Sequence, residues 1–409
     1  PTVLASFDGI GTHGISPEAG LILSGGTLYG TTNLGGANDL GVVFSVPVSG
    51  GTPTILTSFD GIHGANPSAR LTLSGGTLYG TTSAGGASDH GVVFSLPVTG
   101  GTPTVLASFD VTHGDSPRAG LTLSGGTLYG TTFYGGANDK GTVFSLPVTG
   151  GTPTVLASLD ETHGAYPSAE LILSGGTLYG TASFGGNNQM GSVFSVPVSG
   201  GTPTFLTLFD GAHGADPLGE LLLSSGTLYG AANGGVNNDG VVFSLPLSGG
   251  TPTVLASFDG TNGMGPDSGL ILSGGTLYGT AQFGGDNNFG TVYAVPVPEP
   301  GTLALLSVVA GAGWSVRRRR QRPGASVSIQ PQHKSRRSSF LGRKEPAPSK
   351  LPGAASRPGW PDFRIRCKMR RTGSVRNKRS MAEDSLFVVT RGSLSAHGSW
   401  RPPGRAINP

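Results

Sequence analysis

The nine-residue stretch SGGTLYGTT occupies Ser24–Thr32 and recurs without change at Ser74–Thr82 and Ser124–Thr132. Near-copies of it follow at Ser174–Ala182, Ser224–Ala232 and Ser273–Ala281. A second marker, SFD or a variant of it, recurs with the same period of about 50 residues. The sequence therefore predicts a fold built from six tandem repeats.

Each repeat contains four short segments of strand composition, rich in Val, Leu, Thr, Phe and Tyr and bounded by Gly, Pro, Asn or Asp. In the second repeat these segments are Leu71–Ser74, Thr77–Thr82, Val92–Val98 and Thr104–Phe109. The intervening Gly75-Gly76 accepts positive φ at both positions and so suits a two-residue hairpin. No stretch before Gly301 shows a helical apolar period. We therefore expect an all-β chain: a six-bladed β-propeller of four-stranded antiparallel blades over residues 1–297.

The two ends of the repeat region predict how the ring closes. The chain starts with a strand at Thr2–Phe7 that has no earlier partner, and its repeats end on Thr291–Val297, which has no later partner. If the first strand joins the last blade as its outer strand, six blades are complete. Two alternatives stay open: seven blades if the sequence is N-terminally truncated, and a β-solenoid. Because the sequence begins at Pro1 without Met, either a leader has been removed or the sequence is a fragment.

The formal net charge of +3 averages two unlike parts. Residues 1–316 carry three basic and nineteen acidic side chains, about −16, whereas the remainder carries 23 basic and four acidic ones. The strongly acidic repeats disfavour nucleic acid as their partner. The single cysteine, Cys367, lies in the basic part, so the repeats hold no disulfide framework and no thiolate metal site.

The expected topology separates two faces of the propeller. One face carries the tight, nearly identical turns, and the other carries longer loops that differ between repeats. A charged residue precedes the innermost strand of every repeat, which predicts a ring of charges at the mouth of the central channel. This ring binds a polar ligand or is simply solvated; its members are Glu18, Arg70, Arg118, Glu170, Glu220 and Asp267.

Aromatic side chains also occur in the variable loops, after the second strand of a repeat. They either stack on a ligand or cover the edges of the blades. We take four of them as candidate ligand-binding residues: Phe133, Tyr134, Phe184 and Phe283.

Histidine recurs in five repeats, after an aspartate a few residues upstream; the histidines are His13, His63, His113, His163 and His213. Equivalent positions of neighbouring blades lie too far apart for shared metal bonds of about 2 Å. A hydrogen bond within each loop is the expected role. The Asp and Asn residues of the Gly-rich loops are expected to form turns, with calcium at one or two loops as the alternative. We predict no catalytic residue, no metal and no cofactor.

The segment VPEPGTLALLSVVAGAGWSVRRRR follows the repeats. Pro298, Glu299 and Pro300 precede an apolar run, Leu303–Val316, which predicts a short hydrophobic helix. Fourteen residues are fewer than the roughly 20 that span a bilayer. The run ends on a cluster of four arginines, the expected cytoplasmic flank: Arg317, Arg318, Arg319 and Arg320.

These three parts, in this order, resemble the PEP-CTERM sorting signal. The repeats, with LYGTT, GG and G-x-VF in register, are similar to the Kelch-like tandem repeats of the choice-of-anchor GloVer proteins. The resemblance implies export from a Gram-negative bacterium, processing by an exosortase near Pro298–Pro300, and transient anchoring in the inner membrane through residues 303–316. It also implies a destination at the cell surface or in the extracellular matrix, without an established activity.

Residues 321–409 are rich in Arg, Ser and Pro and predict a disordered basic tail. Proteins with this signal end soon after the arginines, so the tail is either a charged extension that contacts anionic lipid or nucleic acid, or a non-native extension. The predicted domains are thus 1–297, 298–320 and 321–409.

The function predicted from the sequence is a non-catalytic binding or scaffolding module for a surface glycan or exopolysaccharide. Two other functions stay open. One is a propeller enzyme, a glycan hydrolase or lyase that uses the carboxylates at the channel mouth. The other is a structural spacer.

Overall fold

The computed structural model describes residues 2–7, 13–186 and 188–297, all within the first of the chain's two units, Pro1–Gly324. This part of the chain consists of strands and loops. None of its segments is a helix long and apolar enough to cross a membrane. The predicted sorting signal, hydrophobic helix and basic tail lie outside the described residues.

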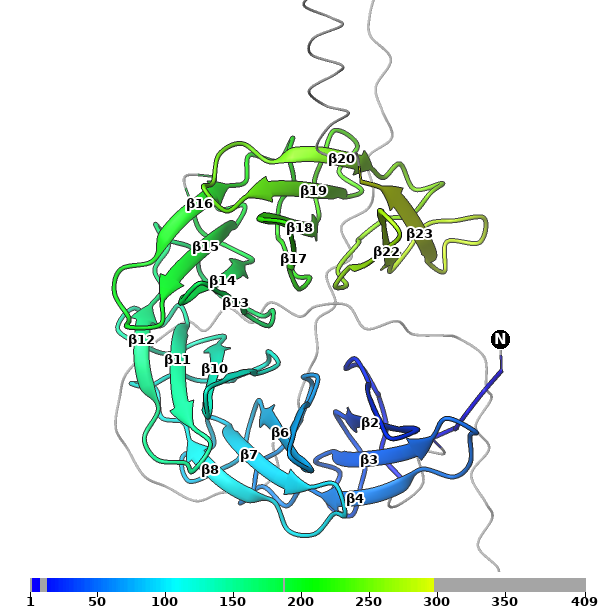
Figure 1. The fold of residues 1–409 in the computed structure, drawn as a ribbon, viewed down its shortest axis with the longest axis vertical. Coiled ribbons are helices and arrows are strands. Elements are labelled where there is room, and N and C mark those ends of the chain that lie inside the picture. Colours follow the sequence, from blue (N-terminus) through cyan, green and yellow to red (C-terminus); the bar gives the residue numbers. More distant parts are fainter. Residues whose placement is uncertain (1, 8–12, 187, 298–409) are drawn as a thin grey trace, which may run out of the picture. The chain divides into compact units, whose positions relative to one another are not determined.

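Twenty-three strands form six antiparallel sheets, one from each repeat, and we number these blades 1 to 6 along the chain (Figure 1). The innermost strands are β1 (Ile22–Ser24), β5 (Thr72–Ser74), β9 (Thr122–Ser124), β13 (Ile172–Ser174), β17 (Leu222–Ser224) and β21 (Ile271–Ser273). The second strands are β2 (Thr27–Thr32), β6 (Thr77–Thr82), β10 (Thr127–Thr132), β14 (Thr177–Ala182), β18 (Thr227–Ala232) and β22 (Thr276–Ala281). The third strands are β3 (Val42–Pro47), β7 (Val92–Pro97), β11 (Thr142–Pro147), β15 (Ser192–Pro197), β19 (Val241–Pro246) and β23 (Thr291–Pro296). The fourth strands are β4 (Thr54–Ser58), β8 (Thr104–Ser108), β12 (Thr154–Ser158), β16 (Thr204–Leu208) and β20 (Thr253–Ser257). The predicted six-bladed propeller is confirmed.

The repeated SGGTLYGTT string forms the hairpin between the first two strands of a blade. In blade 1, Ser24 pairs with Thr27 across the turn, and Gly25 and Gly26 have φ of 55° and 77°. Two consecutive positive φ values are what the primed hairpin turn requires, and glycine adopts them without a steric cost. The turn predicted from the glycine pair is confirmed.

The LYG motif requires its glycine for a different reason, which is close packing against a phenylalanine ring. At Gly130 a Cβ atom would lie 2.7 Å from Cζ of Phe144 on the neighbouring strand of the same blade. A side chain at this position would therefore displace the phenylalanine ring from the core. The string is conserved among the blades because it makes both the turn and this close contact.

The core is a set of layers between successive blades. At the seam between blades 3 and 4, Val143 and Leu156 pack against Leu171, Leu178 and Phe194 of the next blade. The other successive pairs of blades repeat this arrangement. The blades are therefore held together mainly by buried apolar surface between neighbours.

The N-terminal segment, residues 2–7, packs on the outer part of blade 1. Gly51 donates its N–H to the carbonyl oxygen of Leu4 at 2.8 Å, as Gly101 does to Leu56 of β4 at 2.9 Å. Phe7 meets Phe44 edge to face at 4.9 Å between ring centroids. The segment thus takes the place of an outer strand relative to blade 1. It does not pair with β23, and blade 6 has three strands in the part of the chain described, so the predicted closing contact is not formed there.

Candidate functional site

A central cavity of about 600 Å³ lies where the six innermost strands begin, and residues of all six blades line it. The six charged residues that the sequence predicts at the channel mouth are among its lining. Equivalent positions of the repeats face the propeller axis, which is why side chains about 50 residues apart in sequence meet at one cavity. The geometric part of that prediction is confirmed; whether the ring binds a ligand stays a prediction.

The charges occupy two different positions of the repeat. Glu18, Arg118 and Asp267 directly follow the proline of the loop, whereas Arg70, Glu170 and Glu220 directly precede the first leucine of the blade. In blades 1, 3 and 6, where the charge follows the proline, the residue directly before the first leucine is a glycine: Gly20, Gly120 and Gly269. One charge per blade therefore faces the cavity, and a neighbouring glycine leaves room for the side chain of another blade.

The charges are also separated by sign. The arginines come from blades 2 and 3, and the carboxylates come from blades 4, 5, 6 and 1. Nε of Arg70 lies 3.6 Å from Oε2 of Glu170. A ligand in the cavity would meet a cationic side and an anionic side.

Glu170 is the most perturbed acid of the cavity. Burial raises the pKa of its carboxyl group to about 7, against the attraction of Arg70, and the nearby Glu220 raises it further. Its Oε2 is buried without a hydrogen-bond partner. A Cβ atom at Gly120 would lie 2.5 Å from this oxygen, so the backbone of blade 3 covers it. Glu170 therefore lines the cavity with a carboxyl group of raised pKa, and its Oε2 is shielded from solvent.

Two further acids next to the cavity have raised pKa values. Burial raises the pKa of Asp267, which accepts a hydrogen bond from Asn233 Nδ2 at 3.1 Å. Burial also raises the pKa of Asp216, with a contribution from the charge of Asp267. This side of the propeller thus favours protons or cations over additional anions.

The aromatic candidates of blades 3 and 4 lie close together on the loop face. Phe133 and Tyr134 follow β10, and their ring centroids are 4.8 Å apart. Tyr166, from the loop before blade 4, stacks on Phe133 at 5.3 Å and lies 5.6 Å from Tyr134 and 6.0 Å from Phe184. We call Phe133, Tyr134, Tyr166 and Phe184 the aromatic cluster. Phe283 has no aromatic partner among the described residues and lies outside it.

Tyr166 is the member of the cluster that the sequence analysis missed. It has φ of +60°, and the equivalent positions of the other repeats also have positive φ: Ser16, Asn66, Ser116, Asp216 and Gly265. Left-handed backbone is costly for a bulky side chain and is tolerated best by Gly, Asn and Asp. A tyrosine where the other repeats have small or polar residues was the signal that could have revealed this residue.

Arg118 connects the aromatic cluster to the central cavity. It lines the cavity, and its guanidinium carbon lies 4.4 Å from the ring centroid of Phe133 and 6.0 Å from that of Tyr134. These distances are those of a cation–π contact. The cavity and the aromatic cluster are therefore parts of one continuous surface.

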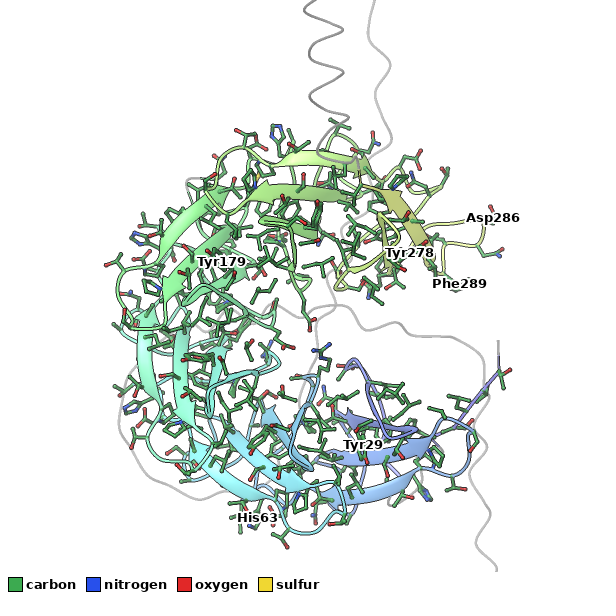
Figure 2. The ribbon with its side chains drawn as sticks, viewed as in Figure 1. Tyr29, His63, Tyr179, Tyr278, Asp286 and Phe289 are labelled. Atoms are coloured by element: carbon green, nitrogen blue, oxygen red, sulfur yellow. The ribbon has the colours of Figure 1, made fainter. Side chains whose placement is uncertain are left out.

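Four of the recurring histidines make the predicted local hydrogen bonds with aspartate: His63, His113, His163 and His213. His63 Nδ1 lies 2.7 Å from Asp60, and the N–H of His63 donates to the same carboxylate at 2.8 Å. In Figure 2 His63 lies at the outer rim, away from the axis. Asp110 and its His113 repeat the contact, and the hydrogen bond from the backbone of His113 lowers the pKa of Asp110.

The acidic residues of the Gly-rich loops also bond to the backbone. Gly85 donates its N–H to Asp89 Oδ1 at 2.8 Å, and Asp89 has φ of +61°. This is the turn-forming role expected for Asp and Asn. Within residues 2–7, 13–186 and 188–297, no three His, Cys, Asp or Glu side chains are grouped as a metal ion would need.

Comparisons with known proteins identify the repeats and the segment that follows them. Residues 1–128 and 97–293 match the model of the Gloeobacter/Verrucomicrobia repeat. Residues 296–320 match the PEP-CTERM protein-sorting motif, which marks an exported protein sorted to the cell surface and implies processing by an exosortase-type enzyme. None of the curated proteins matches the chain.

Three solved structures are similar to the chain at low identity. A protein assigned as TolB from Agrobacterium tumefaciens is 15% identical, with a TM-score of 0.40, over 71% of this chain and 90% of its own. A protein assigned as a 6-phosphogluconolactonase from Bacteroides uniformis is 16% identical, with a TM-score of 0.43, over 69% and 85%. A puromycin-hydrolyzing peptidase from Mycobacterium tuberculosis is 13% identical, with a TM-score of 0.45, over 71% and 50%.

The family model covers most of the chain, and the sorting motif directly follows the last blade. The protein is therefore an exported, surface-sorted β-propeller that belongs to the Gloeobacter/Verrucomicrobia repeat family.

Proposed function

We propose that the propeller is a non-catalytic binding module that holds a glycan of the cell surface or extracellular matrix on its loop face. The observation that carries the proposal is the convergence of charged and aromatic side chains on that face. Arg118 lines the central cavity and contacts Phe133 of the aromatic cluster, so it joins the charged residues of the cavity to the aromatic cluster. Flat exposed rings beside charged and hydrogen-bonding groups suit a sugar, which has apolar C–H faces and a polar edge.

The variation among the repeats supports the same assignment. A structural spacer needs the turns and the seams between blades, and these are nearly identical in all repeats. The aromatic cluster is confined to blades 3 and 4, where packing between blades does not require it. Tyr134 and Phe184 are each 37% exposed.

Binding of the full-length chain to glycans tests this proposal. The purified protein, applied to an array of bacterial surface glycans and exopolysaccharides, should bind a subset of them. Replacing Phe133 by Ser and Tyr134 by Ala, which are the residues of blade 2 at these positions, should abolish that binding and leave the far-ultraviolet circular dichroism unchanged. Absence of binding across the array would refute the proposal.

The C-terminal part of the proposal concerns display. We infer that residues 298–320 are a separate sorting segment, that 303–316 anchor the chain transiently in the inner membrane of a Gram-negative bacterium, and that 321–409 form a separate tail. Alanine at Pro298, Glu299 and Pro300 should leave an unprocessed chain in the membrane fraction. Normal release of that variant would contradict the inference.

A second candidate function is a glycan hydrolase or lyase. It is favoured by the pKa of Glu170, near 7, with Glu220 close enough to influence it, because glycosidases pair an acid of raised pKa with a second carboxylate. The burial of Glu170 Oε2 speaks against this role. If the native chain releases reducing ends from a glycan and Glu170→Gln does not, the protein is an enzyme and the proposal of a non-catalytic binding module is wrong.

A further inference from the structure

The charge balance around the aromatic cluster differs from that of the rest of the propeller. The described residues include three side chains of Lys or Arg, and two of these contact carboxylates. Arg70 lies 3.6 Å from Glu170, and Lys140 Nζ lies 2.9 Å from Glu161 Oε1. Arg118 is exposed and has no carboxylate within ion-pair distance in the part of the chain described. In a strongly acidic domain, this is an unneutralised cation beside exposed aromatic rings.

The rings hold Arg118 in a defined place. Its guanidinium group lies over Phe133, which itself stacks on Tyr166. Stacking on one ring face leaves the N–H edge of a guanidinium group available, and that edge fits a carboxylate with two parallel hydrogen bonds. The surface is thus prepared for an anion of planar, bidentate shape.

Lys140 fixes the ring at the centre of the cluster. Its Nζ donates a hydrogen bond to Tyr166 Oη at 2.9 Å and lies 5.2 Å from the ring centroid. The N–H of Tyr166 donates to the carbonyl oxygen of Lys140 at 2.9 Å. Tyr166 is therefore held from both its backbone and its hydroxyl, in the left-handed conformation that a tyrosine rarely adopts. The left-handed backbone and its hydrogen bond recur in other repeats, so the tyrosine ring and its bond to Lys140 are what distinguish this loop.

We propose that the aromatic cluster and Arg118 form the binding site for an acidic polysaccharide, with sugar rings stacked on Tyr134, Tyr166 and Phe184 and a uronate carboxylate paired with Arg118. This inference rests on the proposed function and specifies the chemistry of its ligand. A peptide with acidic side chains would satisfy Arg118 but would leave the partly exposed rings of Tyr134, Tyr166 and Phe184 without flat partners. A neutral glycan would satisfy the rings but leave Arg118 unpaired.

Binding of uronate oligosaccharides by the full-length chain tests the proposal. The probes are oligogalacturonate, oligomannuronate and oligoglucuronate, each compared with its methyl ester, which keeps the sugar and removes the charge. Because a hydrogen-bonded charge pair contributes about 1.5–3 kcal/mol, the acid form of the preferred oligomer should bind at least about tenfold more tightly than its ester. Calorimetric titration at low and at physiological salt gives both affinities.

The repeats supply the variants that keep the fold. Arg118→Ser copies Ser68 of blade 2 and should remove the difference between acid and ester. Arg118→Lys keeps the charge but not the planar fork, and it should restore only part of that difference. Tyr166→Asn copies Asn66 and suits the left-handed backbone. It should weaken the binding of both forms by about fivefold, because stacking on an aromatic ring is worth about 1 kcal/mol. Its melting temperature should not fall.

Phe283→Ala is the matched control. Phe283 is 43% exposed and occupies the same loop position in blade 6 as Tyr134 in blade 3, but it lies outside the cluster. This variant should bind the acid as the native chain does. An effect as large as that of Tyr166→Asn would overturn the assignment to blades 3 and 4.

The remaining outcomes separate this inference from the proposed function. Equal binding of acid and ester, or binding of neutral glycans alone, would overturn the acidic ligand while the glycan-binding module stands. Tighter binding of poly-glutamate than of any uronate would make the partner an acidic peptide and overturn the inference. If no uronate and no glycan of the array binds, both proposals fail.

Discussion

Equivalent apolar residues are buried at the seam between blades 3 and 4 and exposed where blades 6 and 1 face each other in the ring. Leu171, at the start of blade 4, is 3% exposed, whereas the equivalent Leu21 of blade 1 is 50% exposed. Val143 of β11 is fully buried, whereas the equivalent Val292 of β23 is 81% exposed. The comparison shows that the local sequence does not by itself decide whether a residue is buried. Burial also requires a neighbouring blade that packs against it.

The tyrosines of the LYG motif show the same contrast (Figure 2). Tyr179 packs against the core between blades 4 and 5, whereas Tyr278 of the last blade is 42% exposed. In repeat proteins each repeat contacts only its neighbours, so stability is a sum over seams. The face of blade 6 and the face of blade 1 each lack one such contribution.

Joining the faces of blades 6 and 1 should have the largest effect on stability. Among the described residues β23 is an edge strand with an exposed valine, and such an edge is a liability that a further strand would remove. A disulfide between the two segments would impose the pairing that the structure does not form, with residues 2–7 on β23 in the register of β20 on β19, in which Val242 opposes Ala256. Ala5 would then oppose Val292. In a Cys367→Ser background, Ala5→Cys with Val292→Cys should form a disulfide and raise the free energy of unfolding by about 5 kcal/mol, because the closed loop is long.

Non-reducing electrophoresis and urea unfolding with and without reductant measure this effect. Each single cysteine variant serves as a control for dimer formation. Failure of the double variant to cross-link within one chain would show that the two faces stay apart.

Truncating one leucine at each location sharpens the comparison. Leu171→Ala should lower the free energy of unfolding by about 2–5 kcal/mol, because it leaves a cavity in a closed seam. Leu21→Ala should cost less than about 1 kcal/mol, because half of that side chain is already in water. Urea denaturation of both variants provides the measurement, and equal losses would mean that blade 1 is covered in solution.

Replacing Glu170 of blade 4 should have the smallest effect on the free energy of unfolding, and the size of this effect should depend on pH. Between about 4.5 and about 7, folded Glu170 holds more protons than unfolded Glu170, so the free energy of unfolding falls as the pH rises through this range. The side chain is 16% exposed, and the shift corresponds to about 1–3 kcal/mol. Glu170→Gln should therefore be more stable than the native chain by this amount at pH 8 and nearly equal to it at pH 4.

Glu18→Gln is the control for that measurement. Glu18 lines the same cavity from blade 1 but is exposed, so its replacement should change stability by less than about 0.5 kcal/mol at either pH. A pH profile of Glu170→Gln that runs parallel to that of the native chain would contradict the assignment.

Much of the site could be predicted because the repeats serve as internal comparisons. A charge before every innermost strand, in a fold whose innermost strands surround one axis, had to converge on the channel. The aromatic cluster was only partly predictable. Phe133, Tyr134 and Phe184 stood out as loop aromatics, but Tyr166 lies about 30 residues from Phe133 and reaches it across a blade boundary. The separation of Phe283 from the cluster also depends on which blades are neighbours.

The sequence by itself determined the number of repeats, the strand order within each blade and the hairpin at SGGTLYGTT. These features depend on local rules: short apolar runs, and glycines where φ is positive or where a phenylalanine ring must pass. Only the tertiary structure decided the burial of each copy, the pKa of Glu170 and the partners of Arg118. Those properties depend on the contacts between blades, and identical residues acquire different neighbours at different places in the ring.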